Sequence, residues 1–294
     1  MMARLEVLKT YKLYVGGQFP RSESGRYYPL SNPKGQMIAN ISLGSRKDFR
    51  NAVVAARAAW SGWSGRAAFN RGQILYRIAE MMEGRREQFV AELMQQGAQR
   101  KNAEAETATA IDRIVYYAGW CDKYQQVFSA VNPVASSHFN FSIPESMGVV
   151  SIIADEQTSL IGIVSVVLPI IAGGNVAIVL ASESKPLCAV TLGEVLATSD
   201  LPGGVVNILT GRSKELASHF ASHMDVNAVV YCRSVPEEKK MIQETSALNI
   251  KRVFHYEKDW MKDTSESPYF ILDGQEIKTT WHPIENIGVS GAKY

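Results

Sequence analysis

The chain has 294 residues, of which 46% are hydrophobic and 20% are charged. These proportions are typical of a globular protein and exclude a fibrous, disordered or disulfide-scaffold chain. There are 31 Lys and Arg residues against 29 Asp and Glu residues, which leaves a formal net charge of +2. No run of basic residues is long enough to follow a nucleic-acid backbone, so we expect no nucleic-acid partner.

The cysteine content indicates a reducing compartment. Cys121, Cys188 and Cys232 are an odd number of thiols without CxxC spacing, which suits the cytoplasm better than a secreted, disulfide-stapled domain. The amino terminus has no apolar core of the kind that a secretory signal requires. We therefore predict a cytoplasmic location.

One apolar segment, Leu160 to Ala181, carries no charged residue and is long enough to span a bilayer. Pro169 and the turn at 173–175 divide it into a helix-length piece and a Val/Ile-rich strand. We predict a buried helix followed by a buried strand, and no membrane partner.

Residues 1–125 are predicted to form the N-terminal strands and helices of the domain whose sheet follows later in the chain. A strand pair with loops is expected over residues 11–45, including a strand from Lys12 to Val15. Ser45, with Asp48 three positions later, forms a capping-box pattern at the start of a helix. Further helices are predicted around Ile74–Met82, Arg86–Met94 and Ala103–Tyr124.

Residues 126–146 are predicted to form a hairpin, and residues 258–294 a short linker with one strand. Between them, residues 147–257 alternate five short apolar strands with four helices. This alternation predicts an open α/β domain whose mostly parallel sheet is covered on both faces, which is a doubly wound fold. The predicted strands are Gly148–Ile153, Asn175–Leu180, Val205–Leu209, Asn227–Tyr231 and Ile250–His255, and the helices are Leu160–Ala172, Leu187–Ala197, Lys214–Ala221 and Glu237–Glu244.

Doubly wound sheets bind ligands at the carboxyl ends of their strands. No GxGxxG or GxxxxGK[ST] motif follows any predicted strand, so the fold alone is weak evidence for a nucleotide. His219 and His223 have a spacing that could share a metal ion, but no third ligand accompanies them, and we predict no metal site. Cys232 stands at a strand end without a paired base, which favours a buried thiol over a nucleophile.

Several segments together resemble the aldehyde dehydrogenase superfamily, and the resemblance covers most of residues 11–257. It implies a nucleotide-binding domain with an inserted oligomerisation hairpin, here Val127–Pro144, and a third strand of that arm, here Glu276–Pro283. The matching segments are Lys12–Phe19, Asn32-Pro33, the helix Arg71–Met82, Gly148-Val149-Val150, Ser182-Glu183 and Leu201-Pro202-Gly203-Gly204-Val205-Val206-Asn207.

At the catalytic positions that the resemblance implies, this sequence departs from the family. Gln157 stands where the family has the Asn that stabilises the oxyanion. Tyr256 stands where the family has its general-base Glu, unless the register slips by one to Glu257. These three residues are degenerate catalytic positions, and we predict no catalytic residue.

At the cofactor positions, Ser182 and Glu183 remain from the family's Lys-Pro-Ser-Glu segment, which holds the adenosine ribose, while its lysine is replaced by Leu180. Ser234 remains from the stretch that points at the pyrophosphate. These positions are vestiges of an NAD or NADP site. We expect no bound cofactor, because acidic residues at the strand ends would repel a pyrophosphate and only Arg233 offsets them. The acidic residues are Asp155, Glu156, Glu237 and Glu238.

The family's nucleophilic Cys lies beyond the base segment, in a separate catalytic domain. Residues 233–294 contain no cysteine, and Lys258–Gln275 is too short for a domain, so we expect the catalytic domain to be missing. The pattern most resembles the C-terminal, nucleophile-less domain of the family-16 aldehyde dehydrogenases.

This resemblance favours a non-catalytic, pseudoenzyme-like subunit with a structural or assembly role beside an active aldehyde dehydrogenase. Residues 127–144 and 276–283 would then pair with another subunit, in a homo-oligomer or a hetero-oligomer. Two alternatives stay open. One is an NAD(P)-dependent oxidoreductase with residual or partner-completed activity, and the other is a sensor of a cationic or polar small molecule at the acidic strand ends.

Overall fold

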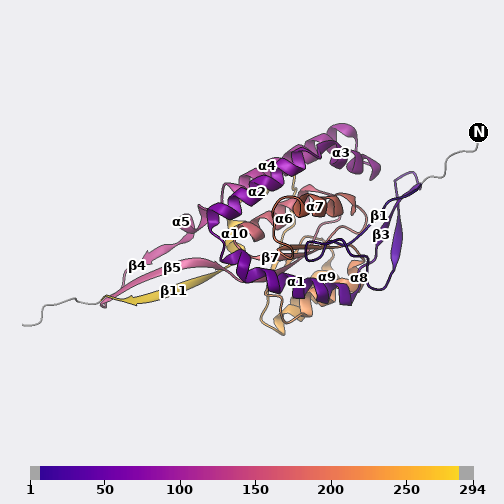
Figure 1. The fold of residues 1–294 in the computed structure, drawn as a ribbon. Helices are drawn as coiled ribbons and strands as arrows, with labels where there is room; N and C mark the ends of the chain where they lie inside the picture. The colour runs from indigo at the N-terminus through magenta and orange to yellow at the C-terminus, as the bar shows by residue number, and fades with distance from the viewer. Residues whose placement is uncertain (1–6, 285–294) are drawn as a thin grey trace, which may run out of the picture.

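The computed structural model describes residues 7–284 and is built around a five-stranded parallel sheet (Figure 1). The strand order is β10-β9-β6-β7-β8, and every neighbouring pair is parallel. The chain starts at the central strand, moves outward to one side and then to the other, which confirms the predicted doubly wound sheet. The strands are β6 Val149–Ile153, β7 Val176–Leu180, β8 Val206–Leu209, β9 Ala228–Tyr231 and β10 Arg252–His255.

The long uncharged segment folds as predicted, into a buried helix and a buried strand. Every residue of α6, Ile161–Ala172, and of β7 is buried. Residues on both faces of β7 are covered by helices, so a continuous apolar run is what its position requires. Among residues 7–284, no helix has the length and apolar character needed to cross a membrane.

Helices cover both faces of the sheet. On one face lie α6 and α7, with α2, α3 and α4 packed outside them, and on the other face lie α1, α8 and α9 (Figure 1). Their bounds are α1 Arg46–Ser64, α2 Ala68–Glu83, α3 Arg86–Gln95, α4 Arg100–Ala118, α7 Leu187–Ala197, α8 Ser213–Ser222 and α9 Pro236–Ala247.

The start of α1 confirms the capping box. The Ser45 hydroxyl accepts hydrogen bonds from the backbone N–H groups of Lys47 and Asp48, and the Asp48 carboxylate accepts one from the Ser45 N–H at 2.8 Å. By contrast, the predicted helix Ala103–Tyr124 ends early. The chain turns at Gly119, whose low helix propensity favours a break, and a short helix α5 resumes at Tyr124–Phe128.

The predicted strand Lys12–Val15 is wrong. Tyr14 makes only an isolated bridge, exchanging backbone hydrogen bonds of 2.9 and 2.7 Å with Ile208 at the edge of β8. The N-terminal strands are instead a small sheet in the order β1-β3-β2, with a hairpin turn at Asn32-Pro33. Its strands are β1 Thr10–Tyr11, β2 Tyr27–Ser31 and β3 Met37–Ser42.

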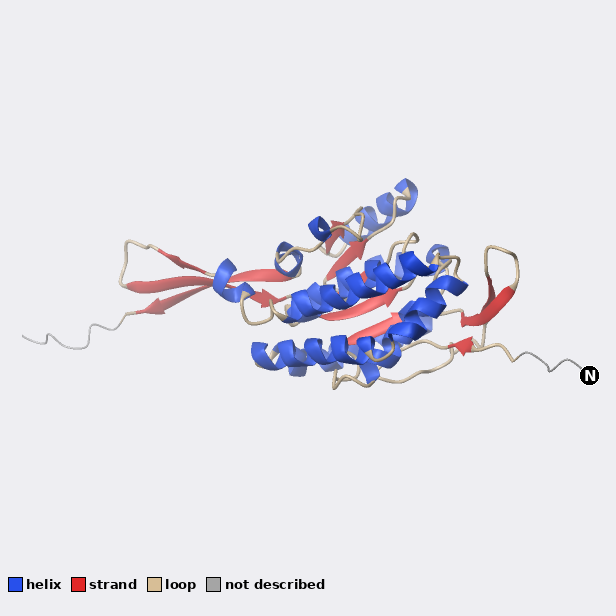
Figure 2. Ribbon diagram, turned by 90° about the horizontal axis from the view of Figure 1, so that it is seen from above, coloured by secondary structure: helices blue, strands red, loops and turns tan. Residues whose placement is uncertain are grey.

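A three-stranded antiparallel arm extends away from the body (Figure 2). Its strands are β4 Ala130–Asn132, β5 His138–Ser146 and β11 Gln275–Pro283. The two long strands pair along their whole length, from Gln275 opposite Ser146 to Pro283 opposite His138. The hairpin begins later than predicted, because Val127 belongs to α5.

The arm and the carboxyl edge of the sheet lie at opposite ends of β6. Strand β5 ends at Ser146 and β6 begins at Val149, so the base of the arm adjoins the amino end of the central strand. On the way back from β10 to β11, residues 256–274 carry only a 3-10 turn, η1 Asp263–Ser265, and a short helix, α10 Tyr269–Asp273.

Candidate functional site

The carboxyl ends of β6, β9 and β10 surround a cavity of about 570 Å³. Three chain segments line it, one after each of β6, β9 and β10: residues 155–158, 232–235 and 257–260. The chain leaves β6 toward one side of the sheet and β9 toward the other, so the cavity lies at the topological switch point, where such sheets bind ligands. The cavity therefore lies at the strand ends where the sequence predicts a ligand site.

An ion pair between a buried arginine and a half-buried glutamate crosses this edge of the sheet. The Arg233 guanidinium lies 2.7 Å from the Glu156 carboxylate, and the two side chains are 6% and 34% exposed. Arg233 also donates to the backbone carbonyls of Ala154, at 2.8 Å, and Ala181, at 3.4 Å. One arginine from the β9 end thus connects the ends of β6 and β7.

The Glu156 carboxylate sits on the turn between β7 and α7. Its oxygens accept hydrogen bonds from the backbone N–H groups of Glu183 and Ser184, at 2.9 and 3.2 Å, and from the hydroxyls of Ser182 and Ser184, at 2.7 and 2.9 Å. Burial alone would raise the pKa of Glu156, but the Arg233 charge and these hydrogen bonds outweigh it and lower the pKa. Glu156 is therefore a stable anion.

The other acidic residues of the expected rim are also engaged. Asp155 closes its own turn, since one carboxylate oxygen accepts the N–H groups of Gln157 and Thr158, both at 2.7 Å. Glu238 accepts hydrogen bonds from the hydroxyls of Tyr231, at 2.9 Å, and Ser213. Of the four carboxylates, Glu237 remains exposed and outside these networks. Three of the four carboxylates that motivated the sensor hypothesis are therefore already hydrogen-bonded within the chain.

The degenerate catalytic positions separate in the structure. Gln157 and Glu257 are exposed and line the cavity, and Glu257 accepts a 2.6 Å hydrogen bond from the Ser234 hydroxyl. Tyr256 is outside the cavity lining; its hydroxyl donates to Asp273 at 2.5 Å, and burial together with Asp273 raises its pKa. Tyr256, which the resemblance places at the general-base position unless the register slips to Glu257, is thus a neutral phenol whose hydroxyl is bound to Asp273.

The vestigial cofactor positions are also divided. Ser234 lines the cavity, whereas Ser182 and Glu183 lie on the β7–α7 turn and are absent from its lining. The Glu183 carboxylate is 42% exposed and lies 4.0 Å from Arg212. The ion pair of Glu156 and Arg233 lies between Ser234 on one side and the β7–α7 turn, with Ser182 and Glu183, on the other.

All three cysteines of the chain are free and buried. Cys232 lines the cavity, but it is only 6% exposed, and burial followed by the charge of Asp155 raises its pKa. Burial likewise raises the pKa of Cys121 to about 12 and that of Cys188 well above its usual value. These thiols stay protonated near neutral pH, so none is an activated nucleophile.

Arg113, which the sequence did not single out, binds the segment after β10 that forms one wall of the cavity. Its side chain, 1% exposed, lies 2.8 Å from Glu266 and donates to the Ser165 hydroxyl at 2.7 Å. It also donates to the backbone carbonyls of Trp260, at 3.3 Å, Lys262 and Ser265. The one signal in the sequence was a charge among the apolar residues that α4 buries. Trp260, buried and lining the cavity, is held in place by this arginine.

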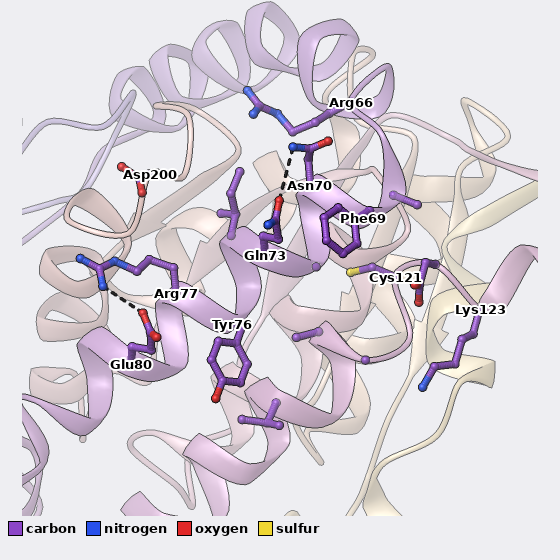
Figure 3. Close-up of a pocket in the computed structure, with 17 residues that line it drawn as sticks. Arg66, Phe69, Asn70, Gln73, Tyr76, Arg77, Glu80, Cys121, Lys123 and Asp200 are labelled. Atoms are coloured by element: carbon purple, nitrogen blue, oxygen red, sulfur yellow. Dashed lines mark hydrogen bonds and ion pairs between the residues drawn. The ribbon is translucent and has the colours of Figure 1, made fainter.

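A second cavity, of about 830 Å³, lies elsewhere, on the outer side of α2 and α4 (Figure 3). Phe69, Gln73 and Tyr76 of α2 line it, together with the surface ion pair Arg77–Glu80. It contains none of the predicted site residues.

Of the histidine pair, His219 lies in the last turn of α8 and His223 at its C-terminal cap. The His223 ring packs edge-on against Phe49, with ring centres 5.7 Å apart, and accepts the Asp225 N–H at 3.2 Å. In the part of the chain that the structure describes, no three His, Cys, Asp or Glu side chains converge as metal ligands would.

The fold and site define the chain as a doubly wound α/β domain with an inserted β arm. The profile of the aldehyde dehydrogenase family matches residues 19–257, which is more than half of the chain, and the chain belongs to that family. This confirms the family that the sequence resembles.

Curated relatives are longer than this chain. Cytosolic 10-formyltetrahydrofolate dehydrogenase of Mus musculus is 28% identical over 256 residues, which are 85% of this chain and 28% of that protein. Aldehyde dehydrogenase, cytosolic 1, of Elephantulus edwardii is 32% identical over 250 residues, 82% of this chain and 49% of that protein. The chain therefore spans about half or less of the length of these relatives.

Solved structures share the fold. An aldehyde dehydrogenase from Bacillus cereus, in its NAD+ complex, superposes with a TM-score of 0.80 at 24% identity, over 84% of this chain and 50% of that one. PnpE from Pseudomonas sp. WBC-3 superposes with a TM-score of 0.80 at 26% identity, again over 84% and 50%. These matches confirm the predicted fold class.

Proposed function

We propose that this chain is a non-catalytic member of the aldehyde dehydrogenase family, with a structural or assembly role beside an active aldehyde dehydrogenase. The observation that carries the proposal is the pair of Glu156 and Arg233. Its two side chains fill the strand ends at which the family resemblance places the ribose and pyrophosphate of NAD or NADP.

The residues present do not fit a dinucleotide at these strand ends. The donors of the β7–α7 turn, Ser182 among them, already bind Glu156. The first turn of α9 carries Glu237 and Glu238, and carboxylates at a helix N-terminus compete with a phosphate for the same N–H groups and dipole. A ligand phosphate would meet negative charge where it needs free donors.

The residues at the catalytic positions support the same proposal. Covalent catalysis on an aldehyde needs an accessible thiolate, an oxyanion donor and a base. Cys232 is a buried, protonated thiol, and the Tyr256 hydroxyl is bound to Asp273. In this chain the segment from β10 to β11 is short, and its residues 257–260 form one wall of the cavity. These observations favour a domain that folds but does not catalyse.

A thermal unfolding titration tests the absence of a cofactor site. We expect NAD and NADP to leave the unfolding temperature of the full chain unchanged, because a ligand that does not bind the folded state cannot stabilise it. A catalytically complete aldehyde dehydrogenase, assayed in parallel, should be stabilised by its cofactor. Saturable stabilisation of this chain by either dinucleotide would contradict the proposal.

The arm supports the assembly role. Four side chains on one of its faces, Val131, Phe139, Phe141 and Ile143, form an apolar arm face by strand register. Val131 is 67% exposed and Phe139 is 45% exposed. Within residues 7–284 the outer edge of β11 has no strand partner. Exposed apolar side chains beside an unpaired strand edge are a typical surface for pairing with another chain.

Light scattering coupled to size exclusion tests the assembly. We expect the full chain to elute as an oligomer, or as a complex when mixed with a cognate aldehyde dehydrogenase. The double variant Val131→Ser, Phe139→Ser should shift it to the monomer. Val54→Ser, Phe69→Ser is the matched control, because these side chains are 64% and 65% exposed on the body. A strict monomer in both conditions would contradict the assembly role.

An NAD(P)-dependent oxidoreductase with residual or partner-completed activity is the second candidate. The observation in its favour is Glu183, whose carboxylate remains partly exposed on the turn that resembles the family's ribose-binding segment. A dinucleotide-dependent stabilisation in the titration above, lost in Glu183→Ala, would support this candidate over the first.

We also propose that the chain acts in the cytoplasm, as its three free thiols and the word cytosolic in the names of its relatives support. Within the family we propose the nucleophile-less domain of family-16 enzymes as its nearest functional counterpart, because both carry the sheet and arm without the nucleophile.

A further inference from the structure

We propose that a cavity at the base of the arm binds a small zwitterion, whose carboxylate lies against Arg71 and Tyr124 and whose ammonium group lies against Glu145. The cavity has a volume of about 670 Å³, and no residue from the carboxyl ends of the sheet strands lines it. The inference goes beyond the proposed function and does not depend on it. It is carried by two buried polar side chains that keep hydrogen-bond donors for a ligand.

The cavity lies between the body and the arm. On the body side it is lined by the end of α1, the start of α2 and Tyr124, the first residue of α5. Helix α5 contacts β5 where the arm leaves the body (Figure 1). On the arm side, Glu145 of β5 and Glu276 and Lys278 of β11 line it. Its two walls therefore come from different parts of the fold and carry different charges.

Arg71 brings a buried positive charge to the body wall. The residue is 4% exposed, and its partners are neutral carbonyls: Nε donates to Ala172 at 3.3 Å, and Nη1 to Ser64 and Arg66 at 3.4 and 2.6 Å. Ala172 and Ser64 are the last residues of α6 and α1, so the guanidinium caps two helix C-termini. These contacts fix its position. Within residues 7–284, neither N–H of Nη2 donates to a carbonyl or carboxylate, so two of its five N–H groups remain for a ligand.

Tyr124 adds a hydroxyl beside this guanidinium. The residue is 2% exposed and lines the cavity, and in the described part of the chain its hydroxyl donates to no acceptor. Burial raises the pKa of the phenol, and the nearby Arg71 charge acts in the opposite direction. Buried hydroxyl groups normally have a hydrogen-bond partner. Here the cavity is the side from which an acceptor can reach the Tyr124 proton.

A guanidinium and a phenol side by side are suited to a carboxylate. Arginine offers N–H groups in a fixed fork that matches the oxygens of a carboxylate, and hydrogen bonds to a charged group are about twice as strong as neutral ones. Arg66, in the connection between α1 and α2, lines the same wall and adds a second positive charge. Because the Arg71 position is already fixed by the helix ends, a ligand carboxylate would bind there at a low entropic cost.

The arm wall favours a positive group. Glu145 and Glu276 stand directly opposite each other in the register of β5 and β11, and like charges at such positions are unfavourable. Glu276 is offset by Lys278, at 3.0 Å, whereas the exposed Glu145 forms no ion pair within residues 7–284. A simple anion would be repelled by Glu145. A ligand that also carries an ammonium group complements both walls.

Thermal unfolding of the full chain tests the site, with ω-amino acids from glycine to ω-aminohexanoate as ligands. The references are the carboxylates of equal length, at an ionic strength matched with sodium chloride. We expect a saturable rise in unfolding temperature with at least one amino acid of the series, and binding about threefold tighter than that of its matched carboxylate. Stabilisation without saturation is the effect of a solute excluded from the protein surface, and on its own it would overturn the proposal.

Tyr124→Phe removes a single donor and leaves the helix caps made by Arg71 in place, so it is the variant that decides. It should weaken binding roughly tenfold. Tyr117→Phe, which removes another buried phenol hydroxyl outside the cavity lining, is the matched control and should bind like the wild type.

Glu145→Gln should remove the preference for an amino acid over its matched carboxylate, since it removes the partner of the ammonium group. Equal binding of amino acids and carboxylates by the wild type would overturn the proposal. So would an affinity that Tyr124→Phe leaves unchanged.

Discussion

The carboxyl edge of the sheet and the arm lie at opposite ends of β6. Charged side chains are paired within the chain at the carboxyl edge, whereas apolar side chains are exposed on the arm. At the carboxyl edge, Glu156, Arg233 and Asp155 each bind partners within the chain. On the arm, Val131 and Phe139 remain exposed. This contrast is what the proposed function expects, since charged side chains pair with one another at the carboxyl edge while the arm keeps exposed apolar side chains.

Removing Arg113 should break the closed end most severely. Arg113→Met keeps the bulk of the side chain but leaves Glu266 and the backbone carbonyls of the 260–265 segment without their donor. Loss of one partner from a buried polar network costs about 3 kcal/mol or more. Urea unfolding should show this loss of stability, and the exposed α2 residue Arg77, changed to Met, should alter it by less than about 0.5 kcal/mol.

A double-mutant cycle on Glu156 and Arg233 should give a smaller effect. We expect Glu156→Ala to lower the free energy of unfolding by about 2 kcal/mol, since it strips a buried guanidinium of its charged partner. Arg233→Met should cost less on a Glu156→Ala background than on the wild type, by about 1 kcal/mol or more. Additive costs in urea unfolding would mean that the pair does not stabilise this edge.

The carboxyl groups of the half-buried Glu156 and the buried Glu92 should respond to pH in opposite directions. The pKa of Glu156 lies below its ordinary value of 4.5, so its stabilising contribution is present above that pH and is lost as the pH falls. The pKa of Glu92 is raised, chiefly by burial, so its contribution to stability declines as the pH rises through 4.5. In stability profiles from acid to neutral pH, Glu156→Gln should flatten the acid loss and Glu92→Gln should steepen it. Identical profiles for the two variants would contradict these directions.

The arm should give the smallest effect on the fold itself. We expect Val131→Ser, Phe139→Ser to change the stability of the monomer by less than about 1 kcal/mol, because the two residues are already 67% and 45% exposed. The wild-type unfolding temperature should rise with protein concentration, as it does for an associating protein, and that of the variant should not. A wild-type unfolding temperature independent of concentration would weaken the contrast between the two ends.

Most of the fold follows from local sequence patterns. The apolar runs predicted α6 and β7, and the bounds of α7 match the predicted Leu187–Ala197. Lys12–Val15 has a strand-like composition, yet it pairs with the sheet only through an isolated bridge between Tyr14 and Ile208 at the edge of β8. Pairing of that kind depends on tertiary geometry rather than on periodicity.

The sequence predicts which strand ends line the cavity, but not the ion pairs and hydrogen bonds found there. The sequence places Glu156 at a strand end, where we expected its charge to repel a ligand. The structure shows that charge neutralised by Arg233 and bound by the β7–α7 turn. Strand order decides which loops meet, and that order was unknown until β6 was seen between β7 and β9. The role of Arg113 likewise depends on where the 256–274 segment packs.

Isothermal titration of the full chain with NAD and with NADP tests the central claim most directly. At about 1 mM ligand, a site with a binding free energy of roughly −4 kcal/mol would be half filled. The ion pair of Glu156 and Arg233 at these strand ends predicts no saturable heat up to that concentration. A saturable isotherm with a stoichiometry near one would contradict the claim that this member of the family has lost its cofactor site.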